Sequence, residues 1–155
     1  MLRRTFINKF SISLSIASLF PFNSFSKNTF NLNYAPHLGM FKNTVGDDPI
    51  DQINYMADLG FRAFEDNGMS SRSVDLQNKI SKTLENRGMK MGVFVAHKIY
   101  WDKPNLSSGD DDYRNEFLNY IENSVEVAKR VNAKWMTVVP GHLDLRKDMS
   151  YQTSN

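Results

Sequence analysis

The sequence of 155 residues contains no cysteine. This absence excludes a disulfide framework, a cysteine-based zinc site and a thiol nucleophile. Any metal chemistry of this chain must therefore use carboxylates and imidazoles.

Several well-known catalytic and phosphate-binding motifs are also missing. No predicted strand is followed by Gly-x-Gly-x-x-Gly or by Gly-x-x-x-x-Gly-Lys-Ser/Thr, and neither Gly-x-Ser-x-Gly nor His-Glu-x-x-His occurs. The sequence thus lacks a phosphate cradle of the nucleotide-binding type, a serine nucleophile elbow and a helical zinc-protease motif.

A strong charge of one sign is absent from the body of the chain. The formal net charge is +2, but Arg3, Arg4 and Lys9 lie in a first segment without acidic residues. The rest is nearly neutral, which gives no electrostatic reason to expect nucleic acid as a partner. The length suits one domain with its own core.

The first segment has the pattern of an export signal. A basic stretch, Met1 to Lys9, precedes the apolar stretch Phe10 to Phe22, and Ser24-Phe25-Ser26 suits cleavage. Within it, Arg3-Arg4-Thr5-Phe6-Ile7-Asn8-Lys9 resembles a twin-arginine signal, with an ordinary secretory signal as the alternative. Because the apolar stretch is short for a bilayer, we expect a signal peptide over residues 1–26, no permanent membrane anchor, and export to a bacterial periplasm.

The body of the chain alternates between short apolar stretches and helical patterns. We expect strands over 31–41, 61–65, 90–96 and 134–142 and helices over 49–59, 73–87 and 117–131. Such β/α units favour a parallel α/β fold, in which chemistry gathers where the strands end. Periodicity does not decide between an open doubly wound sheet and a (β/α)8 barrel.

All three histidines follow predicted strands, so we expect them at this edge. His37, His97 and His142 each come directly after an apolar stretch. His37 is a candidate for holding a substrate hydroxyl or carboxylate, although a loop histidine bonded to backbone is the simpler alternative. Together they have the right chemistry for zinc, but their spacing is not specific for it.

Three further residues are candidates for substrate binding. Glu65 ends the second strand beside Asp66, and at most one of the two carboxylates faces a pocket, because neighbours on a strand point to opposite faces. Trp101 lies in a loop of about fifteen residues after His97 and suits the apolar face of a sugar-like compound. Arg146 is a candidate for binding a carboxylate with two hydrogen bonds, or it is simply solvated.

Five stretches together resemble the hydroxypyruvate isomerase-like branch of the sugar-phosphate isomerase/epimerase superfamily, which has the xylose isomerase-like TIM barrel. The stretches are Tyr34-Ala35-Pro36-His37-Leu38-Gly39-Met40-Phe41, Asp48-Pro49-Ile50-Asp51-Gln52-Ile53, Phe64-Glu65-Asp66-Asn67-Gly68-Met69, Gly92-Val93-Phe94-Val95-Ala96-His97, and the block from Ser124 to Arg146. The resemblance covers residues 31–155. It implies that 27–155 is the N-terminal half of a TIM barrel, with about four β/α units, cut off after the fourth strand.

The resemblance further implies an aldose–ketose isomerisation. In it, a divalent metal such as Mg²⁺ or Mn²⁺ polarises the oxygens while a carboxylate moves a proton through an enediol. Hydroxypyruvate isomerases interconvert hydroxypyruvate and tartronate semialdehyde in this way. The family's metal ligands and two glutamates belong to the second half of the barrel, so none is assigned here. His37, Glu65, His97, Trp101, His142 and Arg146 remain substrate-binding candidates.

We therefore expect a truncated isomerase or epimerase that is inactive alone and that self-associates through exposed barrel edges. The alternative is a non-catalytic carbohydrate-binding half-barrel that needs a partner. A third reading, an endonuclease-like member of the superfamily, conflicts with the missing basic stripe.

Overall fold

The computed structural model describes residues 30–154. The predicted signal peptide over 1–26 therefore lies outside the described residues. No helix within the described part of the chain is both long and apolar enough to cross a bilayer.

Three helices account for most of the regular structure, and each begins at a polar cap. They are α3 (Pro49–Asp58), α4 (Val74–Asn86) and α5 (Asp111–Val131). The side chain of Asp48 accepts a hydrogen bond from Ile50 N, and Ser73 accepts one from Leu76 N, which satisfies free amides at the helix starts. The predicted helices over 49–59 and 73–87 are confirmed.

The third helix begins six residues earlier than its apolar pattern indicated. Asp110 caps α5 by accepting a hydrogen bond from Asp112 N, and Asn132 ends the helix in the left-handed conformation. Its first turn is polar and exposed, so hydrophobic periodicity did not reveal it. Shorter elements are α2 (Lys42–Val45), α6 (Met149–Ser154) and two 3-10 turns, Met69–Ser71 and Leu106–Ser108.

Parallel strand pairs join four segments in the order of the chain. Strand β1 (Ala63–Phe64) pairs with β2 (Lys90–Met91), and single bridges join His37 to Glu65 and Val95 to Thr137. Each pair is connected through a helix, as in β/α units. The fold is therefore mixed α/β with parallel pairing, as expected, although regular strands are much shorter than the predicted ones.

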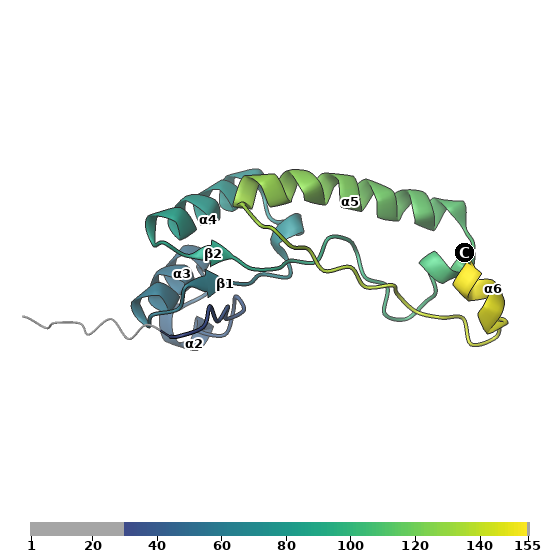
Figure 1. Ribbon diagram of the computed structural model, residues 1–155, viewed down its shortest axis with the longest axis horizontal. Helices are drawn as coiled ribbons and strands as arrows, with labels where there is room; N and C mark the ends of the chain where they lie inside the picture. The colour runs from purple at the N-terminus through teal and green to yellow at the C-terminus, as the bar shows by residue number, and fades with distance from the viewer. Residues whose placement is uncertain (1–29, 155) are drawn as a thin grey trace, which may run out of the picture.

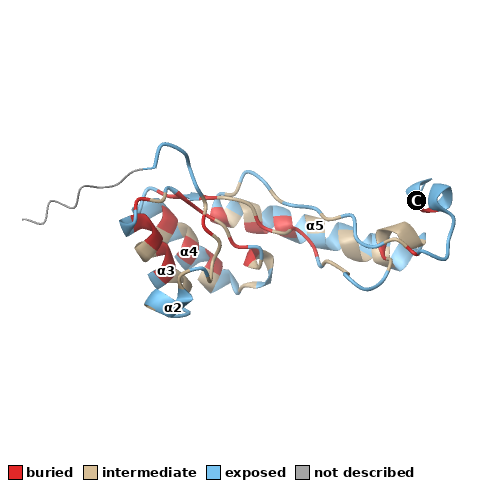
Figure 2. Ribbon diagram, turned by 90° about the horizontal axis from the view of Figure 1, so that it is seen from below, coloured by how far each residue is buried: buried red, intermediate tan, exposed pale blue. Residues whose placement is uncertain are grey.

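The molecule is elongated, and its two ends differ. Helices α2, α3 and α4 gather with β1 and β2 at one end, α5 runs lengthwise, and α6 lies at the far end (Figure 1). The buried apolar residues belong to the first end and to the last turns of α5 (Figure 2). The largest of them are Phe64, Phe94, Ile53, Met56, Met69 and Ile80.

The fourth segment is not the buried strand that the apolar run 134–142 predicted. Trp135 is 73% exposed and Val138 49% exposed, whereas only Met136 packs against the core. The prediction of burial was wrong because, among residues 30–154, the segment has a backbone neighbour on one side only: Thr137 N donates to Phe94 O, and Ala96 N donates to Thr137 O. The structure thus leaves an apolar segment as an edge.

Candidate functional site

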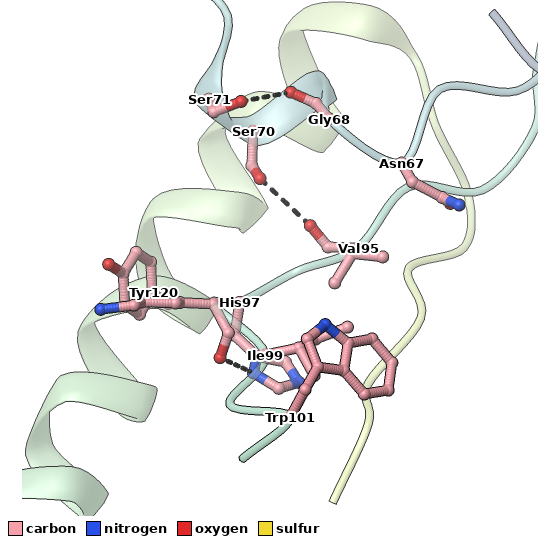
Figure 3. A pocket seen from close by; sticks show the side chains of 10 residues that line it. Asn67, Gly68, Ser70, Ser71, Val95, His97, Ile99, Trp101 and Tyr120 are labelled. Carbon is pink, nitrogen blue, oxygen red and sulfur yellow. Dashed lines mark hydrogen bonds between the residues drawn. The ribbon is translucent and has the colours of Figure 1, made fainter. Parts of the chain in front are cut away.

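A cavity of about 530 Å³ opens where the second and third segments end. The turn after β1 forms one wall, the segment after Val95 forms another, and Tyr120 reaches it from α5 (Figure 3). The lining residues are Asn67, Gly68, Ser70, Ser71, Val95, His97, Lys98, Ile99, Trp101 and Tyr120. This is the edge at which β/α folds assemble their sites.

His97 joins the third segment to the fourth through backbone hydrogen bonds. The imidazole is 6% exposed; its Nε2 accepts from Val139 N at 3.0 Å, and its Nδ1 lies 2.9 Å from Lys98 O. Since Val139 N–H donates to Nε2, the imidazole proton lies on Nδ1 and is donated to the Lys98 carbonyl. Phe117 of α5 packs edge-on against the ring at 5.0 Å between centroids. His97 therefore contributes an imidazole wall to the cavity while both ring nitrogens bind backbone.

His37 makes the same two kinds of bond at the end of the first segment. Its Nε2 accepts from Asn67 N at 3.3 Å, and its Nδ1 lies 2.6 Å from Leu38 O. The bond ties the first segment to the turn that lines the cavity. His37 itself does not line the cavity, so the structure favours the backbone-bonded alternative for its side chain.

The carboxylates of Glu65 and Asp66 have different environments. Asp66 is 2% exposed, forms an ion pair with Arg72 and accepts from Gly68 N at 3.1 Å. Glu65 is half-buried and lies on the same face of the strands as Ala35 and Gly92. A Cβ added to Gly92 would lie 3.0 Å from Phe64 O. Asp66 thus fixes the turn that carries Asn67 to Ser71, whereas Glu65 does not line the cavity.

The rim of the cavity offers an aromatic surface and a cation. Trp101 is 75% exposed, and Lys98, three residues earlier in the chain, is also exposed. The Lys98 ammonium lies 4.5 Å from the centre of the Tyr100 ring, and Tyr100 raises the pKa of Lys98 above its usual value. The arrangement suits a small compound with a carboxylate and a polyol or carbonyl part.

The hydroxyl groups on the opposite wall are used within the protein. Ser70 Oγ donates to Val95 O at 3.1 Å and Ser71 Oγ donates to Gly68 O at 2.8 Å (Figure 3). The first of these bonds ties the turn to the third segment. The second keeps the 3-10 turn closed, so this wall is a rigid one.

His142 and Arg146 do not line this cavity. His142 is exposed and pairs through its backbone with Pro104, while Ser107 Oγ donates to its carbonyl oxygen. Arg146 donates from Nε and Nη2 to the Asp144 carboxylate at 3.0 and 3.3 Å. The hydrogen bonds from the Arg146 side chain are the main cause of the lowered pKa of Asp144. Arg146 therefore binds a carboxylate with two hydrogen bonds, but one of its own chain.

The described residues do not fit the divalent metal that the family resemblance implies. Within 30–154, no three His, Asp or Glu side chains come together as a metal-binding group. The chemistry of the donors agrees, because His37 and His97 have both ring nitrogens at backbone partners and Asp66 is held by Arg72. No step of the chemistry is therefore assigned to a metal here.

Two of the six predicted site residues, His97 and Trp101, line the cavity together. Sequence reasoning missed Asn67, Ser70, Lys98 and Tyr120. Asn67 follows closely after the predicted strand over 61–65, and this place was a usable signal for it. No sequence signal pointed to Tyr120, since it lies within a helix, ten residues past the cap Asp110. The roles of His37, Glu65, His142 and Arg146 in substrate binding remain predictions.

A scan against models of known protein families and a search of curated proteins both find no match for this chain.

Proposed function

We propose that this chain is the substrate-binding half of an exported (β/α)8-barrel isomerase or epimerase, similar to hydroxypyruvate isomerase. The substrate is a small hydroxy-carbonyl compound that carries a carboxylate. The observation that carries the proposal is the cavity at the ends of the second and third segments, where Trp101 and Lys98 lie beside the wall formed by His97.

The order of the strands supports the barrel. Neighbours in the sheet are neighbours in the chain, each joined to the next in parallel through a helix. A doubly wound sheet reverses its strand order at a switch point, whereas a barrel adds each strand beside the previous one. The described segments follow the second pattern.

The residues at the cavity have distinct roles in this proposal. The Lys98 ammonium binds the carboxylate of the substrate, and the Trp101 ring covers its carbon chain. His97 keeps the segment after Thr137 at the wall of the site, so it is a positioning residue. The proton transfer between adjacent carbons needs a carboxylate and an electrophile that the described residues do not bring together, and the chain alone is expected to bind without turnover.

A non-catalytic binding protein for a polyol is the second candidate. The exposed Trp101 ring serves the binding of a polyol as well as that of a carboxylate compound. The two candidates differ in turnover and in the need for a carboxylate on the ligand.

Fluorescence of a single tryptophan tests the binding directly. The chain has two tryptophans, so Trp135→Phe leaves Trp101 as the reporter at the cavity, and Trp101→Phe leaves Trp135 as the matched control. We expect saturable quenching by hydroxypyruvate in the first variant and none in the second. Adding Lys98→Met to the first variant should weaken binding of hydroxypyruvate about tenfold or more and leave a neutral polyol unaffected.

Isomerisation is measured in the same samples with Mg²⁺ and with Mn²⁺. Binding without conversion agrees with the proposed half-site. Binding of neutral polyols but not of hydroxypyruvate would favour the second candidate. Unchanged Trp101 fluorescence with every ligand would contradict both candidate functions.

A further inference from the structure

We infer that the hydrogen bond from Tyr100 to Glu116 of α5 positions the loop at the mouth of the cavity. This loop, residues 98–101, carries Lys98 and Trp101, to which the proposed function assigns ligand binding. Tyr100 and Glu116 are positioning residues, because neither of them lines the cavity. The inference rests on the proposed function for the ligand, but the position of the loop is measurable without any ligand.

The loop has little backbone structure to hold it in place. Within residues 30–154, the backbone of residues 99–102 takes part in no backbone–backbone hydrogen bond. Lys98, Ile99 and Trp101 line the cavity, whereas Tyr100 does not. A loop of this kind opens at low cost in free energy unless its side chains attach it to a more stable element.

Tyr100 provides such an attachment to α5. Its hydroxyl group donates to the Glu116 carboxylate and lies 2.8 Å from one oxygen and 3.0 Å from the other. Both side chains belong to half-buried residues. Because the acceptor is ionised, this hydrogen bond is stronger than one between neutral groups. The Tyr100–Glu116 bond therefore joins the middle of the loop to the helix.

The same face of α5 also holds the chain just before the loop. Glu116, Tyr120 and Ser124 follow one another at a spacing of four residues and so share one face of the helix. Ser124, which is 1% exposed, donates from Oγ to Ala96 O, and Tyr120 lines the cavity. The helix thus holds the chain at Ala96 and at Tyr100, and the residues between these two points line the cavity.

The Tyr100 ring also determines where two cations lie. The ammonium groups of Lys98 and Lys103 lie 4.5 and 4.9 Å from the centre of this ring, at the distance of cation–π contacts. The Glu116 carboxylate repels an anionic ligand by its charge but places the ring and its cations through its hydrogen bond. Removal of Glu116 therefore has opposite effects on anion binding, depending on which of its two roles matters more.

The anisotropy of tryptophan fluorescence tests the position of the loop without a ligand. In the Trp135→Phe chain, Tyr100→Phe removes the hydroxyl group and keeps the ring. We expect the anisotropy of Trp101 to fall, while that of Trp135 in the Trp101→Phe chain stays the same. Tyr113→Phe is the matched control, because its ring lies beside that of Tyr100, at 5.5 Å between centroids, and its substitution leaves the bond to Glu116 in place. Circular dichroism verifies that all variants are folded.

Titration with hydroxypyruvate tests the role of the bond in binding. Tyr100→Phe and Glu116→Leu should each weaken binding about tenfold, the second although it removes a negative charge. Glu116→Gln keeps an oxygen that accepts from Tyr100, so its affinity should stay within about twofold of the parent chain. Lys98→Met should cause almost no further loss in the Tyr100→Phe chain, because the ammonium is already displaced there. A merely structural Tyr100 would leave the full effect of Lys98→Met.

Three results would overturn the inference. They are an unchanged Trp101 anisotropy in Tyr100→Phe, tighter hydroxypyruvate binding in Glu116→Leu, and an undiminished effect of Lys98→Met in the Tyr100→Phe chain. A fall in anisotropy in a chain that binds no ligand would support the attachment of the loop and count only against the proposed function.

Discussion

Different interactions stabilise the two ends of the molecule. The near end is formed by α2, α3 and α4, and the far end carries α6. Between α3 and α4, Phe64, Ile53 and Ile80 have no exposed surface, and their contacts form one apolar cluster. Beyond residue 97, by contrast, the buried residues of the described chain are mostly polar: Asn105, Ser124, Asp144 and Gln152. The near end is stabilised by burial, and the far end by individual hydrogen bonds.

This difference explains where the cavity lies. Its rigid wall, Asn67 to Ser71, is attached to the apolar cluster through Met69 and through the buried pair of Asp66 and Arg72. Its other wall, after Val95, leads into the polar end. A site at such a boundary combines a fixed surface with one that opens at low cost in free energy.

The largest expected effect is at the near end, for Phe64→Ala. Phe64 is fully buried in β1. Loss of its ring should lower the free energy of unfolding by about 3–5 kcal/mol, because a cavity remains where the ring was. Urea denaturation followed by circular dichroism measures the change.

Leu145→Ala is the control for a loss of apolar atoms from an exposed side chain at the far end. Leu145 is 87% exposed, so the substitution should change stability by no more than about 0.5 kcal/mol. Equal losses in the two variants would contradict the division into an apolar and a polar end.

The second prediction concerns the junction between the ends, at His97. His97→Leu keeps an apolar side chain there but removes the acceptor for Val139 N. Local opening of the segment after Thr137 should become easier by about 1–3 kcal/mol, because a donor loses its partner. Amide hydrogen exchange at Val139 and Thr137 reports this change, and exchange within α4 should stay the same.

His142→Leu is the matched histidine control. Its imidazole is exposed and does not line the cavity, so exchange at Val139 should not change. If His97→Leu and His142→Leu gave the same amide exchange at Val139, His97 would not have the positioning role proposed for it.

How far the sequence predicts the structure also differs between the two ends. Capping residues and helical spacing predicted α3 and α4, because Asp48, Ser73 and the apolar face act locally. At the far end, the run from Lys134 to His142 has the composition of a buried strand, but burial needs neighbours on both sides, which composition does not reveal. The site shows the same limit: a strand followed by histidine predicted the place of His97 but not that its nitrogens bind backbone.

A single close approach at the far end illustrates the point. Gly141 has a φ of +94°, and a Cβ there would overlap Oδ1 of Asn105, which is 3% exposed. Pro140-Gly141 reads as a simple turn in the sequence, whereas its contact lies 36 residues earlier in the chain. Long-range contacts of this kind leave no local signal.

The third prediction concerns Gln152, which holds α6 to the preceding loop. Its Oε1 accepts from Asp144 N at 2.6 Å, and its Nε2 donates to Asp144 O at 3.0 Å and to Lys147 O at 3.1 Å. Gln152→Ala should detach α6 locally, with a cost of about 1–3 kcal/mol in opening free energy and little change in global unfolding. Exchange at the Asp144 amide measures it, and Thr153→Ala, an exposed neighbour, is the control expected to show no loss.

The smallest effect is a dependence on pH that only the far end should show. Hydrogen bonds from the Arg146 side chain and backbone lower the pKa of Asp144 from its usual 3.8, and bonds from Ser150 and Tyr151 lower the pKa of Asp148. A carboxyl whose pKa is lower in the folded state adds stability above its unfolded pKa, and this stability is lost as the pH falls through the folded value. The contacts of the loop 144–148 with α6 should therefore keep their full stability from neutral pH down to the ordinary aspartate range and weaken slightly below it.

The start of α4 provides the comparison, because its cap, Ser73, does not titrate. In amide NMR spectra recorded at decreasing pH, Ser150 and Tyr151 should shift before Leu76 does. Asp144→Asn and Asp148→Asn together should weaken the contacts of α6 slightly at neutral pH and abolish the dependence on pH. Simultaneous shifts at both helix starts would mean that acid unfolds the chain as one unit, and the two ends would then not be independent.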